Sequence, residues 1–247
     1  EWFYKGLISG DSLRINFQKE VFGEDFRYED YKHIFKAELF DADAWAELFK
    51  RSGAKYVVFT SKHHDGYCMY DSRYAKGWSS ATTAPQRDFC KELTDAVRKR
   101  DMKMCMYYSL TEWTNPLYRW TVDTLKSIDE YVEKHLHPQF KEMVDMFSPS
   151  LVFSDGDWDF DYKTFKSDEL VSYYFDKVGE EAIVNDRWGG GFDYGYVTPE
   201  YSEAIKQTER PWAECRGLSR SFGLNRNADL ESYLTSEELI RHFVRLV

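Results

Sequence analysis

The feature that most restricts the fold is an alternation of predicted helices and strands in which polar residues directly follow each strand. Helices are predicted at residues 41–53, 88–100, 127–147 and 167–179, and strands at residues 56–60, 102–109, 151–154 and 182–184. Two more short strands are expected at 211–216 and 221–225, a capping box at 235–238 predicts a last helix, and residues 1–40 read as a long loop with short helices. This alternation is typical of a parallel α/β fold.

The polar clusters recur at the carboxyl ends of successive strands, which favours a (β/α)8 barrel of the TIM type over an open sheet. About six strands are predicted, and the chain opens without a first strand and closes on a helix. We therefore expect a barrel that is incomplete at both ends, within a longer protein, since a barrel sheet with two open edges invites pairing with other chains.

Composition excludes some partners. The net charge of -10 argues against nucleic acid and against an anionic membrane surface. No apolar stretch approaches the ~20 residues that a membrane-spanning helix needs. Aromatic residues make up 18% of the chain, and although most are expected in the core, such side chains also suit the apolar faces of sugar rings. The four cysteines form no CxxC pair, and Cys105 is expected to be a buried thiol.

One strand leads straight into acidic residues. The run 151–154 is followed by Asp155, Gly156, Asp157 and Trp158. A buried parallel strand that ends in a carboxylate presents that acid at the catalytic face of a barrel. The alternative is that Asp155 only caps the following loop.

Two adjacent histidines follow another strand. His63 and His64 lie between Lys62 and Asp65, just beyond the strand predicted at 56–60. A metal site is one interpretation, but neighbouring residues of a strand point to opposite faces and no HxH or HExxH pattern is present. Hydrogen bonding to a polyhydroxylated ligand fits better, because a neutral imidazole offers one donor and one acceptor.

Acids at several strand ends suggest glycoside cleavage, which needs one carboxyl group to attack or activate water and another to transfer a proton. The candidates are Asp155, Asp157, Asp186 and Glu200, and three tryptophans after strand ends could line a sugar pocket: Trp113, Trp158 and Trp188. Arg187 could hold a carboxylate in its charged form, or it could pair with Asp186 to order the rim of the barrel.

With these residues in place, the sequence resembles glycoside hydrolase family 29, the α-L-fucosidases. The matching runs follow the family's order over nearly the whole chain: residues 1–2, 53–58, 62–66, 107–109 with 112–113, 154–158 and 184–189. The runs at 112–118 and 154–158 are closer to the animal lysosomal-type branch than to the strict α-1,3/4 branch.

The resemblance implies a retaining α-L-fucosidase that acts on fucosylated oligosaccharides or glycoconjugates without a metal or organic cofactor. Asp155 matches the nucleophile and Glu200 the acid/base, with Glu203 and Glu214 next in line. The implied substrate-binding residues are Glu1, Trp2, His63, His64, Tyr107, Trp158 and Arg187. Residues 1–247 would be part of the catalytic barrel domain, whose first strand and following β-sandwich lie outside this chain. An oligomer is possible, and a secreted, periplasmic or lysosomal location is expected.

Two other functions are compatible with the same residues. A fucose-binding module without turnover would keep the pocket, although acids at both catalytic positions argue against it. A metal-dependent barrel hydrolase is the second alternative. Hydrolysis of an aryl fucoside separates the enzyme from the module, and a chelator assay separates it from the metal-dependent enzyme.

Overall fold

The structure is a computed structural model that describes residues 2–118, 127–201, 209–223 and 225–246. The chain forms two compact units, Glu1–Asp193 and Tyr194–Val247.

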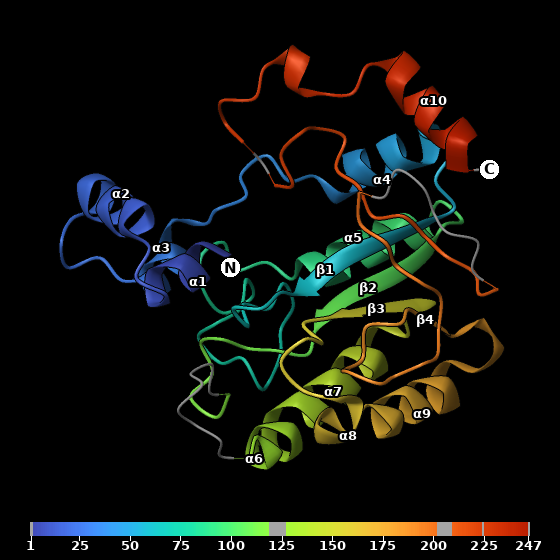
Figure 1. Cartoon of the computed structure of the whole chain (residues 1–247), viewed down its shortest axis with the longest axis horizontal. Coiled ribbons are helices and arrows are strands. Elements are labelled where there is room, and N and C mark those ends of the chain that lie inside the picture. Colours follow the sequence, from blue (N-terminus) through green and yellow to red (C-terminus); the bar gives the residue numbers. More distant parts are fainter. Residues whose placement is uncertain (1, 119–126, 202–208, 224, 247) are drawn as a thin grey trace. The chain divides into compact units, whose positions relative to one another are not determined.

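The first unit contains a parallel four-stranded sheet in the order β1-β2-β3-β4 (Figure 1). Its strands are β1 (Tyr56–Lys62), β2 (Lys103–Ser109), β3 (Leu151–Asp155) and β4 (Ile183–Val184). Lys62 is in register with Tyr108, and Ser109 with Asp155, so the carboxyl ends of β1, β2 and β3 meet at one edge of the sheet. The predicted α/β class and the four strands up to residue 184 are confirmed.

Helices between the strands begin and end where the sequence indicates. The side chain of Asp41 caps α4 (Ala42–Arg51), and the side chain of Asp88 caps α5 (Phe89–Arg98). The helix predicted at 127–147 is a continuous series of α6 (Asp129–Tyr131), the π-helical η2 (Val132–Leu136) and α7 (His137–Phe147). The remaining connections of this unit are α8 (Tyr162–Phe165), α9 (Ser167–Val178) and η3 (Gly179–Glu181).

The two faces of the sheet differ, because one of them packs against the helices through β2. On one face, Met104, Met106 and Tyr108 of β2 belong to the buried hydrophobic core, and the Tyr108 ring contacts Phe140 of α7. Alternation along the strand turns Tyr107 to the opposite face. The core therefore fixes β2 from the helix side and leaves the other face available for a site.

A buried side chain extends the ladder between β3 and the short β4. The amide of Asn185 accepts from the backbone N–H of Ser154 at 2.9 Å and donates to the Ser154 carbonyl at 2.8 Å. These two bonds replace a pair of backbone bonds at the point where β4 has ended. They hold the chain that follows β4 against the carboxyl end of β3.

The N-terminal segment is more helical than predicted. It contains α1 (Trp2–Ile8), α2 (Ser12–Phe22), η1 (Tyr28–Asp30) and α3 (Tyr31–Ile34). The longest of these helices, α2, has 11 residues. At its start, the Asp11 side chain accepts hydrogen bonds from the backbone N–H groups of Leu13 and Arg14. These helices lie on the side toward which the arrows of β1 and β2 point (Figure 1).

The second unit holds η4 (Leu230–Ser232) and α10 (Ser236–Leu246). The predicted capping box is confirmed, because Thr235 and Glu238 exchange backbone–side-chain hydrogen bonds. The strands predicted at 211–216 and 221–225 are wrong for the described residues. Trp212 and Cys215 form only isolated parallel bridges, to Val197 and Glu200, and residues 221–223 are bends.

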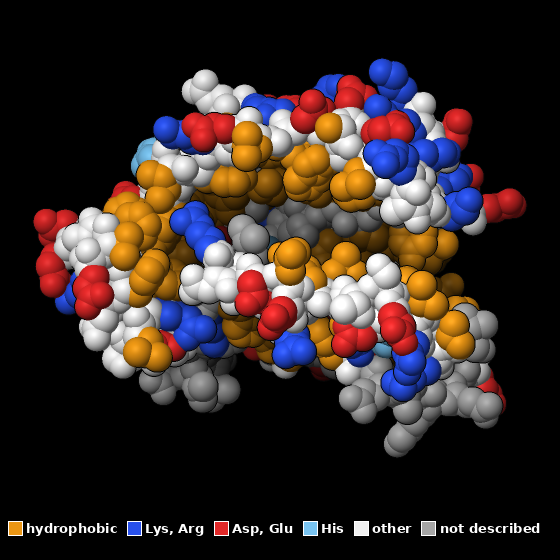
Figure 2. All heavy atoms as spheres, turned by 90° about the horizontal axis from the view of Figure 1, so that it is seen from above, with side chains coloured by type: hydrophobic (Ala, Val, Ile, Leu, Met, Phe, Trp, Pro, Cys, Tyr) orange, Lys and Arg blue, Asp and Glu red, His pale blue; other side chains and the backbone are white. Residues whose placement is uncertain are grey.

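Hydrophobic side chains also reach the surface, and several groups of them are visible in Figure 2. In α10 the exposed ones are Ile240, Phe243 and Val244, which share one face by their spacing. In the described part of the chain, no helix has both the length and the apolar character required to cross a bilayer.

Candidate active site

The Asp155 carboxylate is the centre of the polar cluster at the strand ends. Asp155 is the last residue of β3 and is 8% exposed. The Tyr107 hydroxyl donates to Oδ2 at 2.6 Å, and Nη1 of Arg187 donates to Oδ1 at 3.1 Å. Both oxygens of this carboxylate are therefore oriented, one by a side chain of β2 and the other by a side chain of the segment after β4.

A row of flat side chains crosses the face of the sheet beneath this carboxylate. The His63 ring lies parallel to Tyr107 with 5.1 Å between ring centroids, and Tyr107 stacks on Phe153 at 5.7 Å. The Arg187 guanidinium lies 5.4 Å from the centroid of Phe153. Phe153 thus contacts both Tyr107 and Arg187, the two residues that bind Asp155. Sequence reasoning missed it, although its position two residues before Asp155 places it on the same face of β3.

His64 is enclosed by aromatic rings. Trp2, Trp113 and Trp158 lie 5.8, 5.0 and 5.0 Å from the imidazole centroid, and His64 is 1% exposed. Burial, helped by the nearby charges of His63, Lys62 and Arg187, lowers the pKa of His64 to about 2. The imidazole is therefore neutral at physiological pH.

Trp2 and Trp158 provide accessible aromatic surface beside His64. Their rings stack with 6.1 Å between centroids, and they are 50% and 48% exposed. Trp188 does not share this place and is a correction to the sequence interpretation. It is fully buried against Phe140 and Phe192, because its indole N–H donates to the Asn185 carbonyl and turns the ring into the core.

From the sequence, Arg187 could either hold a carboxylate in its charged form or pair with Asp186. The structure supports the first interpretation, because the guanidinium pairs with Asp155. Asp157, the competing acid, is partly buried beside this cluster. Burial and the neighbouring Asp155 charge raise its pKa. The hydrogen bonds from Tyr107 and Arg187 go to Asp155.

His63, His64 and Asp155 each offer a possible ligand atom within 4.8 Å of one another. A divalent cation at this place would lie beside the guanidinium of Arg187, which already binds Asp155. The positive charges of the cation and the guanidinium would repel each other, so His63, His64 and Asp155 fit a metal ion poorly.

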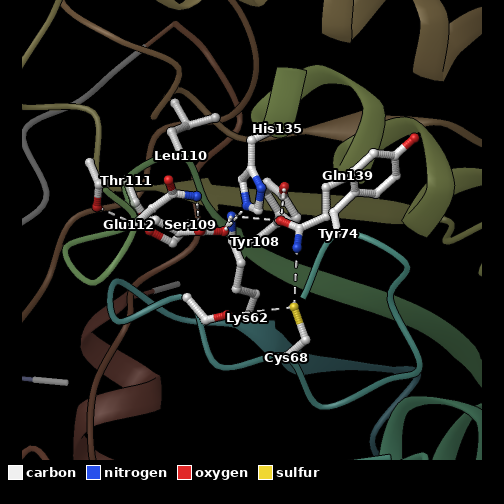
Figure 3. A network of polar contacts seen from close by, with 12 residues as sticks. Lys62, Cys68, Tyr74, Tyr108, Ser109, Leu110, Thr111, Glu112, His135 and Gln139 are labelled. Atoms are coloured by element: carbon white, nitrogen blue, oxygen red, sulfur yellow. Dashed lines mark hydrogen bonds and ion pairs between the residues drawn. The ribbon is translucent and has the colours of Figure 1, made fainter. Parts of the chain in front are cut away.

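A second, buried polar network surrounds Lys62, the residue that precedes the two histidines (Figure 3). Nζ of Lys62 is 2.7 Å from Oε1 of Glu112 and 3.0 Å from Oε1 of Gln139, and Lys62 is fully buried. His135 and Asn115 also contact the Glu112 carboxylate, at 2.7 and 2.9 Å. The ion pair joins the end of β1 to the segment after β2, which are 50 residues apart in sequence.

Packing against Glu112 also explains the glycine of the motif at 62–66. Gly66 has φ +76°, and a Cβ there would lie 2.9 Å from the Glu112 side chain. The backbone N–H of Trp113 donates to the His64 carbonyl at 2.7 Å. Residues after β2 therefore hold the His63–His64 turn in place.

The remaining predicted residues lie elsewhere or are not described. Glu1 and Glu203 fall outside the described residues. Glu200 is exposed in the second unit and forms a bridge with Cys215. Glu214, in the same unit, pairs with Arg216 and His242. The first unit thus brings together Trp2, His63, His64, Tyr107, Asp155, Trp158 and Arg187, and the approach of Glu200 to Asp155 stays a prediction.

Comparison with known proteins gives one consistent result. A family model described as Alpha-L-fucosidase matches residues 1–247. The chain is 35% identical to an alpha-L-fucosidase of Dictyostelium discoideum and 32% identical to human plasma alpha-L-fucosidase, with 100% and 94% of the chain covered. It matches 55% and 52% of those proteins and so spans about half their length.

A solved structure of Thermotoga maritima alpha-fucosidase in complex with fucose is 32% identical to the chain, with a TM-score of 0.82. That match covers 98% of the chain and 56% of the solved protein. The match supports the predicted fold class, in which the four parallel strands belong to a (β/α)8 barrel.

The Lys62–Glu112 pair makes stability depend on pH. Burial alone would raise the pKa of Glu112, but Lys62 and His135 outweigh it and lower the pKa from 4.5 to about 2. Because the folded-state pKa is depressed, this stabilisation is complete above pH 4.5 and is lost as the pH falls toward 2. We expect Glu112→Gln to cost about 3–5 kcal/mol in unfolding free energy at pH 7, and less at acidic pH. Denaturant titration of both proteins from pH 7 to pH 3 measures this.

The double variant Lys62→Met/Glu112→Gln is the control. It should be less destabilised than the sum of the two single variants, because neither charge is then left alone in the core. A Glu112→Gln deficit that does not change with pH would contradict this account of the pair.

Proposed function

Because the chain belongs to the α-L-fucosidase family, we propose that it carries the catalytic centre of a retaining α-L-fucosidase that releases terminal α-L-fucose from fucosylated glycans. The observation that carries the proposal is the Asp155 carboxylate, which ends a buried strand and is oriented through both oxygens by Tyr107 and Arg187. Residues 1–247 would be part of the catalytic barrel domain.

Asp155 is proposed as the nucleophile. One carboxylate oxygen would attack the anomeric carbon, form a glycosyl ester and expel the leaving-group oxygen. Tyr107 and Arg187 limit the rotation of the carboxylate, so little orientational freedom is left to lose in the transition state. Gly156 has φ +77°, and a Cβ there would lie 2.8 Å from Oγ1 of Thr111, so the turn after Asp155 leaves no room for a side chain.

Glu200 is proposed as the acid/base. It would protonate the leaving oxygen in the first step and remove a proton from water in the second, which gives net retention of configuration. Retaining enzymes place their two carboxyl groups ~5 Å apart, and inverting enzymes roughly 6.5–9.5 Å. We expect the shorter separation between Asp155 and Glu200 when sugar is bound.

Sugar binding is proposed for Glu1, Trp2, His63, His64, Tyr107, Trp158 and Arg187. Two accessible indoles, Trp2 and Trp158, offer apolar surface for a sugar face. The imidazoles of His63 and His64 and the guanidinium of Arg187 offer polar contacts. A human relative is named plasma alpha-L-fucosidase and a bovine one tissue alpha-L-fucosidase, which supports a secreted or lysosomal enzyme.

The nucleophile assignment predicts a rescue experiment. Asp155→Gly should lose nearly all hydrolysis of an aryl α-L-fucoside, by roughly 10³-fold or more, because the covalent step has no carboxylate. Added azide should restore part of the turnover by attacking the anomeric carbon in place of the missing group. Asp157→Gly is the matched control, two residues along. Retained activity in Asp155→Gly with loss in Asp157→Gly would move the role to Asp157.

The acid/base assignment predicts a dependence on the leaving group. Glu200→Ala should slow substrates with poor leaving groups at least ~10²-fold and activated aryl fucosides far less, because only poor leaving groups need protonation. Steady-state kinetics on the two substrate classes measure the difference. Glu214→Ala serves as the comparison. Equal slowing of both classes in Glu200→Ala would assign the role to another acid.

A further inference from the structure

The hydroxyl of Ser109 has a defined direction. Its Oγ lies 2.9 Å from the backbone carbonyl oxygen of Thr111 and 2.8 Å from Nδ1 of His64, and both Ser109 and Thr111 are fully buried. A carbonyl oxygen can only accept a hydrogen bond, and a serine hydroxyl has one proton. Ser109 therefore donates its proton to Thr111.

The direction at Ser109 fixes the proton on His64. Since the Ser109 proton is already used, the short contact with Nδ1 needs a proton on the imidazole, and Nδ1–H donates to Ser109 Oγ. The Thr111 hydroxyl, 3.2 Å away, can donate to the same oxygen. If Ser109 instead donated its proton to Nδ1 of His64, its hydroxyl oxygen would face the carbonyl oxygen of Thr111 at 2.9 Å without a proton between them. Both oxygens are buried, so this arrangement would be unfavourable.

The other ring nitrogen faces the Asp155 cluster. Nε2 of His64 lies 3.7 Å from Oδ2 of Asp155, which is longer than a hydrogen bond. A neutral imidazole with its proton on Nδ1 presents a lone pair at Nε2. The strongly lowered pKa of His64 agrees with a neutral ring.

We propose that Ser109 is a positioning residue that holds His64 in the Nδ1–H tautomer, so that Nε2 accepts a hydrogen bond from a hydroxyl of the bound sugar. The inference rests on the proposed function for the identity of the ligand but on the chain's own hydrogen bonds for the tautomer. Ser109 and Thr111 lie at the end of β2 next to the Lys62–Glu112 network, which anchors this corner (Figure 3).

The proposal sets a condition on the ligand. The group that meets Nε2 must be a donor, so a sugar in which that hydroxyl is replaced by hydrogen or by fluorine loses the bond, since neither can donate. A histidine with a proton on Nε2 would instead donate a hydrogen bond, and could bind a ligand oxygen that carries no proton.

The direct test is the tautomer itself. Two-bond proton–nitrogen correlation spectra of the native protein, labelled with ¹⁵N in its histidine rings and assigned with His64→Gln, report which nitrogen carries the proton. We expect His64 to be protonated at Nδ1 alone between pH 5 and pH 8. A signal with the proton on Nε2, or an even mixture of tautomers, overturns the proposal.

The second test separates positioning from folding. In Ser109→Ala we expect a mixture of tautomers and about tenfold weaker binding of L-fucose by calorimetry. Ser61→Ala is the matched control, because this buried serine of β1 donates to the Tyr107 carbonyl and does not contact His64. Thr111→Val keeps the carbonyl and should keep the tautomer. Unchanged His64 signals and fucose affinity in Ser109→Ala contradict the proposal.

The tautomer measurement needs no turnover. If the protein fails to bind fucose, the proposed function is wrong while the spectra still decide the state of His64. If fucose binds and His64 carries its proton on Nε2, only the present inference fails.

Discussion

The ion pair between Asp155 and Arg187 is the constraint on which the candidate site depends. It connects the end of β3 to the segment after β4, and the Tyr107 hydroxyl brings in β2. Three neighbouring strands thus converge on one carboxylate, which is possible because a parallel sheet ends all its strands at one edge. The stacked side chains of His63, Tyr107, Phe153 and Arg187 lie beside the same carboxylate and support the two residues that bind it.

A second buried ion pair supports the histidines. Lys62 and Glu112 lie behind the His63–His64 turn, and their hydrogen bonds to Gln139, His135 and Asn115 compensate the loss of water around both charges. Such a network stabilises little in total, but it penalises any displacement that separates its members. The Asp155–Arg187 pair is thus largely buried at the edge of the site, and the Lys62–Glu112 pair is enclosed next to the His63–His64 turn.

Much of this arrangement could be predicted from the sequence, because it follows from local patterns. The strand before Asp155 and the caps at Asp41 and Asp88 are set by nearby residues. The partners of Lys62, the role of Phe153 and the hydrogen bond between Ser109 and His64 depend on contacts between segments far apart in the sequence, which no local pattern reports. Trp188 was misplaced for the same reason, since only packing against Phe140 shows that it turns inward.

Covalent trapping of the nucleophile tests the central claim most directly. A fucosyl fluoride with fluorine at carbon 2 forms the glycosyl ester with loss of fluoride but hydrolyses slowly, because the electron-withdrawing fluorine destabilises the positive charge of both transition states. The account predicts that peptide mass spectrometry of the treated protein finds one fluorofucosyl group, attached to Asp155. An adduct on Asp157 or any other residue, or full turnover with inverted configuration and no adduct, would contradict it.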